Sequence, residues 1–224
     1  DIDLEIDELT GHVTKAKGQN VIATRTVAKD AEQTALITKY DAVAAPLANK
    51  VVASITADIL KTPNAAGESP LGDVIADAQL EATQASNQAV AAFMNPGGIR
   101  ADLVFAQSSG GEAAGQVTYG EAFTVQPFGN TLVTLTVTGE QIDTMLEQQW
   151  SLVGGVEKAN TLQVSSGFSY TWDSTKPIGS RIDPATIKID GVVVDPTKSY
   201  RITVNAFIAA GGDGFAVLKS GTNP

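Results

Sequence analysis

Three short apolar segments of this chain each run into a loop that holds glycine beside a polar or aromatic side chain. The loops comprise residues 95–100, 126–130 and 205–215. Glycine has no Cβ, so it permits a sharp turn and lets backbone N–H groups come close to a ligand. Strands that end in such loops predict an α+β domain whose loops carry the functional groups.

Apolar spacing and capping residues predict three long helices. Apolar residues three and four positions apart predict the first helix over 30–58, which Pro46 is expected to kink or interrupt. The second is predicted to begin after Ser69, a residue type that caps helix N-termini. A capping box at Thr138 predicts the third, which is expected to run through residue 150.

Alternating or continuous apolar residues predict the strands. An Asp-Gly pair that ends at Gly191 predicts a tight hairpin turn. The strands are expected at 2–7, from 21 onward, and at 90–94, 131–137, 162–172, 186–189 and 199–205.

Charge and composition exclude several classes of protein. The 224 residues include 15 basic and 25 acidic side chains, a formal charge of −10 that repels polyanions and anionic membranes. Nucleic acid is therefore not expected as a partner. No apolar run approaches the roughly 18 residues that cross a bilayer, so no membrane insertion is expected. The chain has no cysteine, which excludes disulfides, thiolate metal sites and thiol nucleophiles.

The first glycine loop pairs a flexible backbone with a cation. Gly97 and Gly98 let backbone N–H groups approach a ligand, and Arg100 can donate charge-assisted hydrogen bonds to an oxyanion or a hydroxyl. Asn95 opens the loop with an amide. The alternative is a tight turn with a surface arginine.

The second and third loops add aromatic and acidic groups. Phe128 lies between Pro and Gly, where its ring can serve as a stacking platform with Asn130 beside it as an amide. The alternative is a phenylalanine that only anchors its loop. Asp213 lies among three glycines, after Phe207, and a constrained carboxylate can accept both hydroxyls of a ribose diol. The alternative is a calcium loop or an acidic turn, but calcium prefers several oxygen ligands and this loop has one carboxylate.

Together the loops offer ring stacking, amide contacts, diol capture and an oxyanion contact. These are the requirements of a nucleoside or nucleotide. Four motifs occur in the order found in 5′-nucleotidase C-terminal domains, which the chain resembles from about residue 50 to its end. The motifs are ESPLGDVIADA at 68–78, NPGGIR at 95–100, PFGN at 127–130 and GGDGF at 211–215.

The resemblance implies a role for each candidate residue. The purine lies between two phenylalanines that match Phe128 and Phe207, and an aspartate that matches Asp213 holds the ribose hydroxyls. Asparagines that match Asn95 and Asn130 contact the base, and an arginine that matches Arg100 faces the phosphate. The implied fold is a four-layer α/β/β/α arrangement with mixed sheets.

Two positions depart from the family pattern. Some members have a further phosphate-contacting arginine just before the first motif, where this chain has Gly67, so the phosphate contact is in doubt unless Lys61 reaches it. The usual triple glycine after the asparagine is Pro96-Gly97-Gly98 here, which stiffens the turn.

The resemblance also implies the domain organisation. Residues 1–29 are expected to be the last strands of an upstream metallophosphatase domain, residues 30–54 a linker helix, and residues 55–224 the C-terminal domain. Hydrolysis needs two divalent metals. The only histidine here is His12, so no metal or other cofactor is expected on this chain, and the missing domain is expected to supply both metals.

The implied activity of the intact protein is that of an exported enzyme, extracellular or in the cell wall or periplasm. It hydrolyses nucleoside monophosphates, and some members accept cyclic nucleotides or nucleotide sugars. Two alternatives stay open. One is a non-catalytic secreted module that binds nucleotides or the cell wall, and the other is a structural, β-rich cell-wall domain.

Overall fold

The computed structural model describes all 224 residues and divides them into two compact units, Asp1–Ala44 and Ala45–Pro224. The first unit holds an antiparallel hairpin of β1 (Ile2–Ile6) and β2 (Val13–Gly18). Helix α1 (Ala31–Ala48) begins in this unit, and its last residues belong to the second. No helix of the structure combines the length and apolar character that a bilayer crossing requires.

The hairpin differs from the expected pair of half-buried strands. Every residue of both strands is exposed, and the second strand begins at Val13 rather than near residue 21. The Asp7 carboxylate accepts hydrogen bonds from the N–H groups of Leu9 and Thr10, which closes the turn at once. Gly11 completes the turn with a φ of 71°, so the chain pairs directly with β1.

Helix α1 ends ten residues before residue 58 and six before the expected end of the linker helix at residue 54. Asp30 caps it through the N–H of Gln33, as expected. Pro46 lies in the last turn, where it cannot donate a backbone hydrogen bond. Residues Val51–Ser54, predicted to be helical, form strand β3 because their backbone pairs with β5 (Gln116–Thr118).

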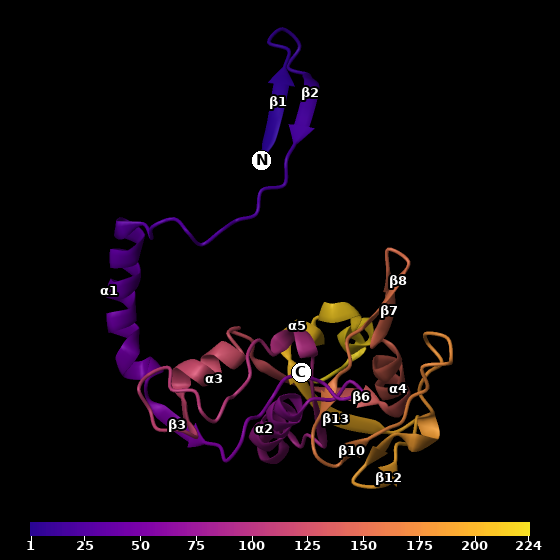
Figure 1. Cartoon of the computed structure of the whole chain (residues 1–224). Helices are drawn as coiled ribbons and strands as arrows, with labels where there is room; N and C mark the ends of the chain where they lie inside the picture. Colours follow the sequence, from indigo (N-terminus) through magenta and orange to yellow (C-terminus); the bar gives the residue numbers. More distant parts are fainter. The chain divides into compact units, whose positions relative to one another are not determined.

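A four-stranded mixed sheet forms the centre of the second unit (Figure 1). Strands β4 and β13 are parallel neighbours, and the two outer strands run antiparallel to them. In spatial order the strands are β6 (Leu132–Thr138), β13 (Ser199–Asn205), β4 (Ala91–Met94) and β9 (Gln163–Val164).

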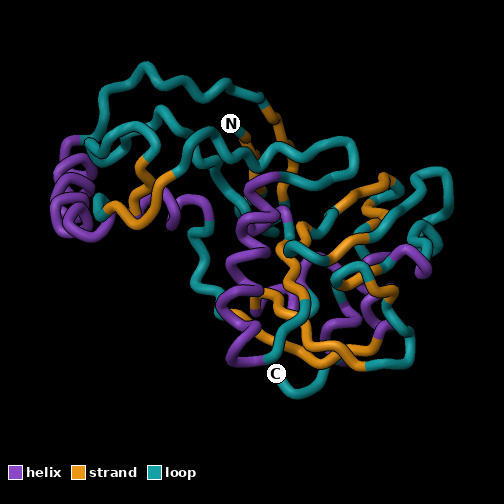
Figure 2. The backbone as a smooth tube through the Cα atoms, turned by 90° about the horizontal axis from the view of Figure 1, so that it is seen from below, coloured by secondary structure: helices purple, strands orange, loops and turns teal.

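The alternation of side chains gives this sheet two different faces. One face packs against α4 (Gly139–Glu147) in the larger apolar core, whose central members are Phe93, Leu135, Ile142, Met145, Ile202 and Val204. The opposite face meets α2 (Pro70–Asn87), where buried threonine hydroxyls are hydrogen-bonded to one another. The Thr203 hydroxyl lies 2.7 Å from that of Thr83 and 2.9 Å from that of Thr134. Helices therefore cover both faces (Figure 2).

Shorter elements complete the second unit. They form a three-stranded sheet, a second hairpin and two short helices, with 3₁₀ turns between them. Their bounds are α3 (Tyr119–Val125), β7 (Trp150–Val153), β8 (Val156–Ala159), β10 (Phe168–Ser169), β11 (Lys188–Ile189), β12 (Val192–Val193) and α5 (Ala206–Ala209), with 3₁₀ turns at Pro96–Gly98, Pro184–Thr186, Gly212–Gly214 and Ala216–Ser220.

Local signals in the sequence locate the helix starts and the hairpin turn. Ser69 caps α2 by accepting from the N–H of Gly72. Thr138 begins α4 with a complete capping box. Asp190 and Gly191 adopt positive φ angles of 50° and 77° between β11 and β12, as an Asp-Gly hairpin turn requires. These expectations are confirmed, as is the α+β class with mixed sheets.

Three features of the secondary structure were predicted wrongly. Helix α4 ends at Glu147, because Trp150 begins β7 and pairs with Ala159. The strand expected at 162–172 is two short strands, since Gly167 turns the chain with a φ of 88°. The loop at 126–130 follows helix α3 and not a strand.

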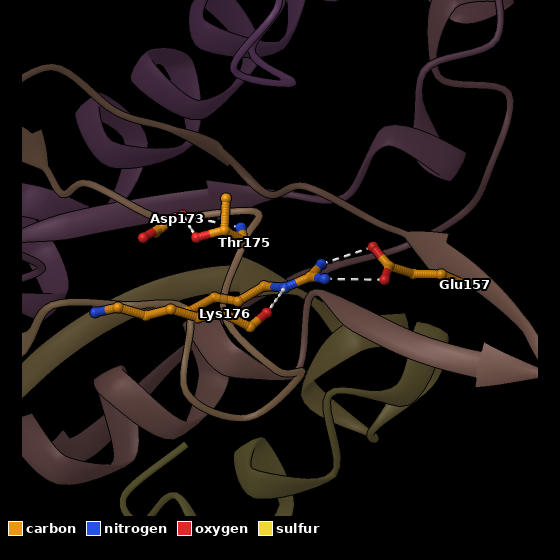
Figure 3. A network of polar contacts seen from close by, with 5 residues as sticks. Glu157, Asp173, Thr175 and Lys176 are labelled. Atoms are coloured by element: carbon orange, nitrogen blue, oxygen red, sulfur yellow. Dashed lines mark hydrogen bonds and ion pairs between the residues drawn. The ribbon is translucent and has the colours of Figure 1, made fainter.

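The β7–β8 hairpin is fixed to the body of the unit through Glu157, which is labelled in Figure 3 and is bound by Arg181. The nearly buried Arg181 guanidinium donates two hydrogen bonds to the Glu157 carboxylate, at 2.6 and 2.9 Å, and one to the Lys176 carbonyl at 3.1 Å. It also lies 5.3 Å from the Trp150 ring centroid. These charge-assisted bonds hold the pKa of Glu157 below its usual value.

Candidate functional site

The structure brings all eight candidate residues around one cavity of about 320 Å³. They come from three loops that are far apart in the sequence. The residues that line the cavity are Asn95, Gly97, Gly98, Arg100, Phe128, Asn130, Phe207 and Asp213.

The topology of the central sheet explains why these loops meet. Asn95 follows the last residue of β4 and Asn205 is the last residue of β13, and these two strands are parallel neighbours. Their carboxyl ends therefore lie at the same edge of the sheet. Strand β6 runs antiparallel to β13, with Leu132 paired to Asn205, so Asn130 enters the sheet at that edge.

A chain of side-chain hydrogen bonds fixes the carboxylate of the site. The Asn95 amide donates to Asp213 Oδ2 at 2.7 Å, and Asn205 donates to Asn95 Oδ1 at 2.8 Å. Asn205 in turn caps α5 by accepting from the N–H of Ile208 at 3.1 Å. Both asparagines are almost fully buried. The Asp213 carboxylate thus has one oxygen fixed and the other without a protein partner.

The backbone around Asp213 is constrained. Asp213 adopts the left-handed φ of 54°, which is uncommon for a residue with a side chain. The 3₁₀ turn that holds it begins after Gly211 and ends before Phe215. A Cβ at Gly212 would lie 2.6 Å from the Phe207 ring, so a glycine is needed where this ring packs on the loop.

Two half-exposed phenylalanines stand at the cavity. Phe128 and Phe207 each retain 47% of their surface accessible to solvent. Large apolar side chains are usually buried, and an exposed aromatic ring on a cavity wall is available for stacking. Both rings occur on the loops where the sequence predicted them.

One cation, Arg100, lines the cavity, and a second, Lys61, contacts the backbone of Arg100. The exposed Arg100 guanidinium lies 6.0 Å from the Phe128 ring centroid, and its Nη1 donates a hydrogen bond to the Gly97 carbonyl at 3.4 Å. Lys61 Nζ lies 3.4 Å from the carbonyl oxygen of Arg100. The Arg100 guanidinium keeps further N–H groups that can donate charge-assisted hydrogen bonds to an anion at the cavity.

The two glycines of the first loop differ in how closely they are packed. A Cβ at Gly97 would touch Asp213 Oδ2 at 3.4 Å, and a Cβ at Gly98 would collide with the methyl group of Met94. At Gly67, a Cβ would lie 2.5 Å from the Thr161 hydroxyl, and its φ is 91°. An arginine at position 67 would not fit this backbone.

Asn205 was not among the site residues expected from the sequence. Its position repeats that of Asn95, since each asparagine stands at the end of a buried strand. That repetition was visible in the sequence, but the contact between the two amides depends on the pairing of β4 with β13.

The arrangement as a whole places a fixed carboxylate, two exposed rings and a cation around a cavity at the end of a sheet. The sequence model of the family described as 5′-nucleotidase, C-terminal domain, matches residues 49–220. The chain belongs to this family. The mixed sheets and helices described above are thus those of a 5′-nucleotidase C-terminal domain.

Solved and curated proteins agree with this assignment. The 5′-nucleotidase precursor from Thermus thermophilus has 31% sequence identity and a TM-score of 0.70, over 99% of this chain and 42% of that one. Endonuclease YhcR of Bacillus subtilis is 32% identical over 93% of this chain. Cell wall protein Lmo0130 of Listeria monocytogenes is 30% identical over 98% of it. The chain spans only 15% and 28% of these two curated relatives.

No group of three or more histidine, cysteine, aspartate or glutamate side chains in this chain is placed to hold a metal ion. His12, the only histidine, is exposed in the turn between β1 and β2. The residues of this 5′-nucleotidase C-terminal domain therefore do not fit a two-metal centre.

Proposed function

We propose that this domain binds a nucleoside or nucleotide in the eight-residue cavity and presents it to a metal-bearing catalytic domain of the same polypeptide. The observation that carries the proposal is the meeting of Phe128, Phe207 and Asp213 at one cavity of about 320 Å³. Cavities of roughly 300–1,000 Å³ are the usual size for small-molecule ligands. A purine nucleoside needs both a stacking surface and a diol acceptor, and these residues supply both.

In the proposed complex the base lies between Phe128 and Phe207, with the exposed Asn130 amide available to its polar edge. Base–aromatic stacking contributes about 1–3 kcal/mol per base. Because a π-face belongs to every base, the rings favour nucleosides in general, and the amide is the group that would discriminate among bases.

The ribose is proposed to bind at Asp213. Its Oδ2 accepts from Asn95, so the carboxylate is already oriented before a ligand arrives, and the other oxygen can accept from the 2′- and 3′-hydroxyls. The Asn95 amide is buried and is hydrogen-bonded at both its oxygen and its nitrogen. We therefore assign Asn95 a positioning role for Asp213 rather than a direct base contact.

Arg100 and Lys61 are proposed to face the phosphate. Arg100 lines the cavity, and Lys61 Nζ lies 3.4 Å from the carbonyl oxygen of Arg100. The hydrolytic step itself needs a metal-activated water, which the upstream domain is proposed to supply. This chain alone is proposed to be inactive. An activity that releases phosphate from AMP and co-purifies with the isolated chain would contradict that statement.

The intact protein is proposed to be an exported nucleotide hydrolase. Two matches support this: the solved 5′-nucleotidase precursor and the relative named as a cell wall protein. Nucleoside monophosphates are the proposed substrates. A non-catalytic nucleotide-binding module of the cell wall is the second candidate, because one relative carries that cell-wall name.

Removal of either ring tests the proposed stacking. Phe128→Ala and Phe207→Ala should each weaken adenosine binding by about 1–3 kcal/mol, since each removes one stacking face. Both side chains are half-exposed, so neither change should alter the thermal melting temperature much. Calorimetric titration with adenosine measures the affinity.

Phe123→Ala is a matched control for these variants. Phe123 is also about half exposed, but it stacks on Tyr119 along helix α3 and does not line the cavity. Its removal should leave adenosine binding unchanged. The proposal fails if wild-type affinity persists in both cavity variants, or if the control loses as much as they do.

A further inference from the structure

A second cavity, of about 410 Å³, shares a wall with the eight-residue cavity. Gly98, Phe128 and Asn130 line both. The second cavity lies between helices α2 and α3, and we call it the α2–α3 cavity. Its walls are largely apolar, with Leu71, Val74, Ile75 and Ala78 from α2 and Ala122 and Val125 from α3.

One buried amide oxygen on this wall lacks a hydrogen-bond partner. Gln79 is only 6% exposed, and its Oε1 accepts no hydrogen bond from the protein. Buried polar atoms in native proteins nearly always have a partner, so an orphaned oxygen that lines a cavity points to a partner from outside the chain. The partner must donate a hydrogen bond.

The nitrogens of two glutamine amides at this cavity are also poorly matched. Gln79 Nε2 donates to the Met94 thioether sulfur at 3.4 Å, and Gln126 Nε2 and Asn205 Nδ2 point to the same sulfur at 3.6 Å. A thioether sulfur is a weak acceptor. Asn205 Nδ2 also donates to Asn95 Oδ1. The Gln79 and Gln126 nitrogens, in contrast, have only the sulfur and so keep hydrogen-bonding capacity for a stronger acceptor.

An occupant that satisfies these groups needs a donor and an acceptor side by side on an apolar body. A primary carboxamide provides both, because its N–H₂ can donate to Gln79 Oε1 and its oxygen can accept from a neighbouring amide. An aromatic ring fits the apolar walls that α2, α3 and Phe128 provide. A charged group does not fit, since no cation or carboxylate lines the cavity.

We propose that the α2–α3 cavity is a second ligand site, which binds a neutral aromatic carboxamide through Gln79. The site is separate from Asp213 and Phe207, so it does not depend on the proposed nucleoside site. Both sites lie on the same unit and meet at Phe128.

Benzamide is the probe that tests this site on the full chain. Ligand-observed NMR or calorimetry should detect binding of benzamide at one site. N,N-dimethylbenzamide keeps the ring and the carbonyl but cannot donate, so it should bind at least about tenfold more weakly. Equal binding of the two amides, or no benzamide binding up to its solubility limit, would overturn the proposal.

Two variants locate the binding. Gln79→Leu keeps the apolar bulk and removes the amide, and it should lower benzamide affinity by about tenfold or more. Ala78→Trp fills the cavity from an exposed position of α2 and should abolish benzamide binding. Ala85→Trp, at another exposed position of α2 outside the cavity, is the matched control and should bind benzamide like the wild type.

Adenosine titration of the same variants separates this proposal from the proposed function. Ala78 does not line the eight-residue cavity, so Ala78→Trp should still bind adenosine. Benzamide binding that survives in Ala78→Trp would contradict the assignment to this cavity. If neither the wild type nor any variant binds adenosine, the nucleoside site is contradicted. The benzamide measurements then still test the α2–α3 cavity.

Discussion

At the scale of single residues, Asn95 connects the loops of the site. Its buried amide donates to Asp213 and accepts from Asn205, so one side chain joins the ends of β4 and β13 to the acidic loop. A carboxylate that is oriented in advance loses less freedom when it binds a diol. The affinity for ribose is therefore expected to depend on a residue that is itself covered by protein.

Asn95→Ala should weaken binding of adenosine but not of 2′,3′-dideoxyadenosine. Only the first ligand has the hydroxyls that Asp213 is proposed to accept, and Asp213 loses its partner in this variant. The change also removes the oxygen that accepts from the buried Asn205 Nδ2, so the free energy of unfolding should fall by about 1–3 kcal/mol. Parallel titrations and urea unfolding measure the two effects.

The exposed Asn130 provides the comparison for stability, since Asn130→Ala should leave the free energy of unfolding nearly unchanged. An equal loss of affinity for both nucleosides in Asn95→Ala would show that Asn95 acts on the base or the fold and not through Asp213.

At the scale of elements, the first turn of α2 carries an unfavourable charge. Burial raises the pKa of Asp73 to about 6, and the neighbouring Glu68 and Asp77 carboxylates add to the rise. Asp73 Oδ1 is buried without a hydrogen-bond partner. An acidic residue near a helix N-terminus normally stabilises the helix, but here desolvation and like charges oppose that benefit.

Asp73→Asn should raise stability near neutral pH. The folded pKa of about 6 exceeds the usual 3.8, so this carboxyl contributes most stability below about pH 3.8, and the contribution is lost as the pH rises through 6. Asparagine cannot ionise. Because Asp73 is partly exposed, the gain at about pH 7.5 should be about 1 kcal/mol, less than the full shift implies.

Thermal melting at about pH 7.5 and at about pH 4 measures this effect, and the advantage of Asp73→Asn should shrink at the lower pH. Glu81→Gln, at an exposed position of the same helix, should show no such dependence. An advantage of equal size at both pH values would mean that the asparagine acts by packing or hydrogen bonding instead of charge.

At the scale of the whole molecule, the acidic surface opposes the ligand that the site is proposed to bind. The formal charge is −10, whereas the one cation that lines the cavity is Arg100, with Lys61 at its backbone carbonyl. Gly67 has no space for an additional arginine. Both cations are exposed, and exposed charge pairs contribute little free energy because water and salt screen them.

The isolated chain should therefore prefer AMP to adenosine by less than about tenfold, or about 1.4 kcal/mol. Arg100→Ala should remove most of that preference and leave adenosine affinity nearly intact, since the base and ribose contacts remain. Side-by-side titrations of both ligands at low and high salt measure the preference. A hundredfold preference for AMP would contradict the expectation, and Lys61→Ala would then identify its source.

The sequence by itself determined the features that depend on residues close together in the chain. Ser69 and Thr138 mark the starts of α2 and α4, and the Asp-Gly pair at 190–191 marks a hairpin turn. A cap or a turn is a contact over two to four positions, so its residues can be recognised without the fold. The composition of the three loops likewise suggested which side chains to seek, and all eight line one cavity.

Only the tertiary structure decided how these pieces are joined. Residues Val51–Ser54 became a strand because β5, more than sixty positions later, pairs with them. The hydrogen bond of Asn205 to Asn95 and the burial of the unpaired Gln79 oxygen both depend on tertiary contacts, which no local sequence pattern encodes. The bonds from Asn95 span 110 and 118 positions, and they exist because parallel pairing of β4 with β13 places two distant strand ends at one edge of the sheet.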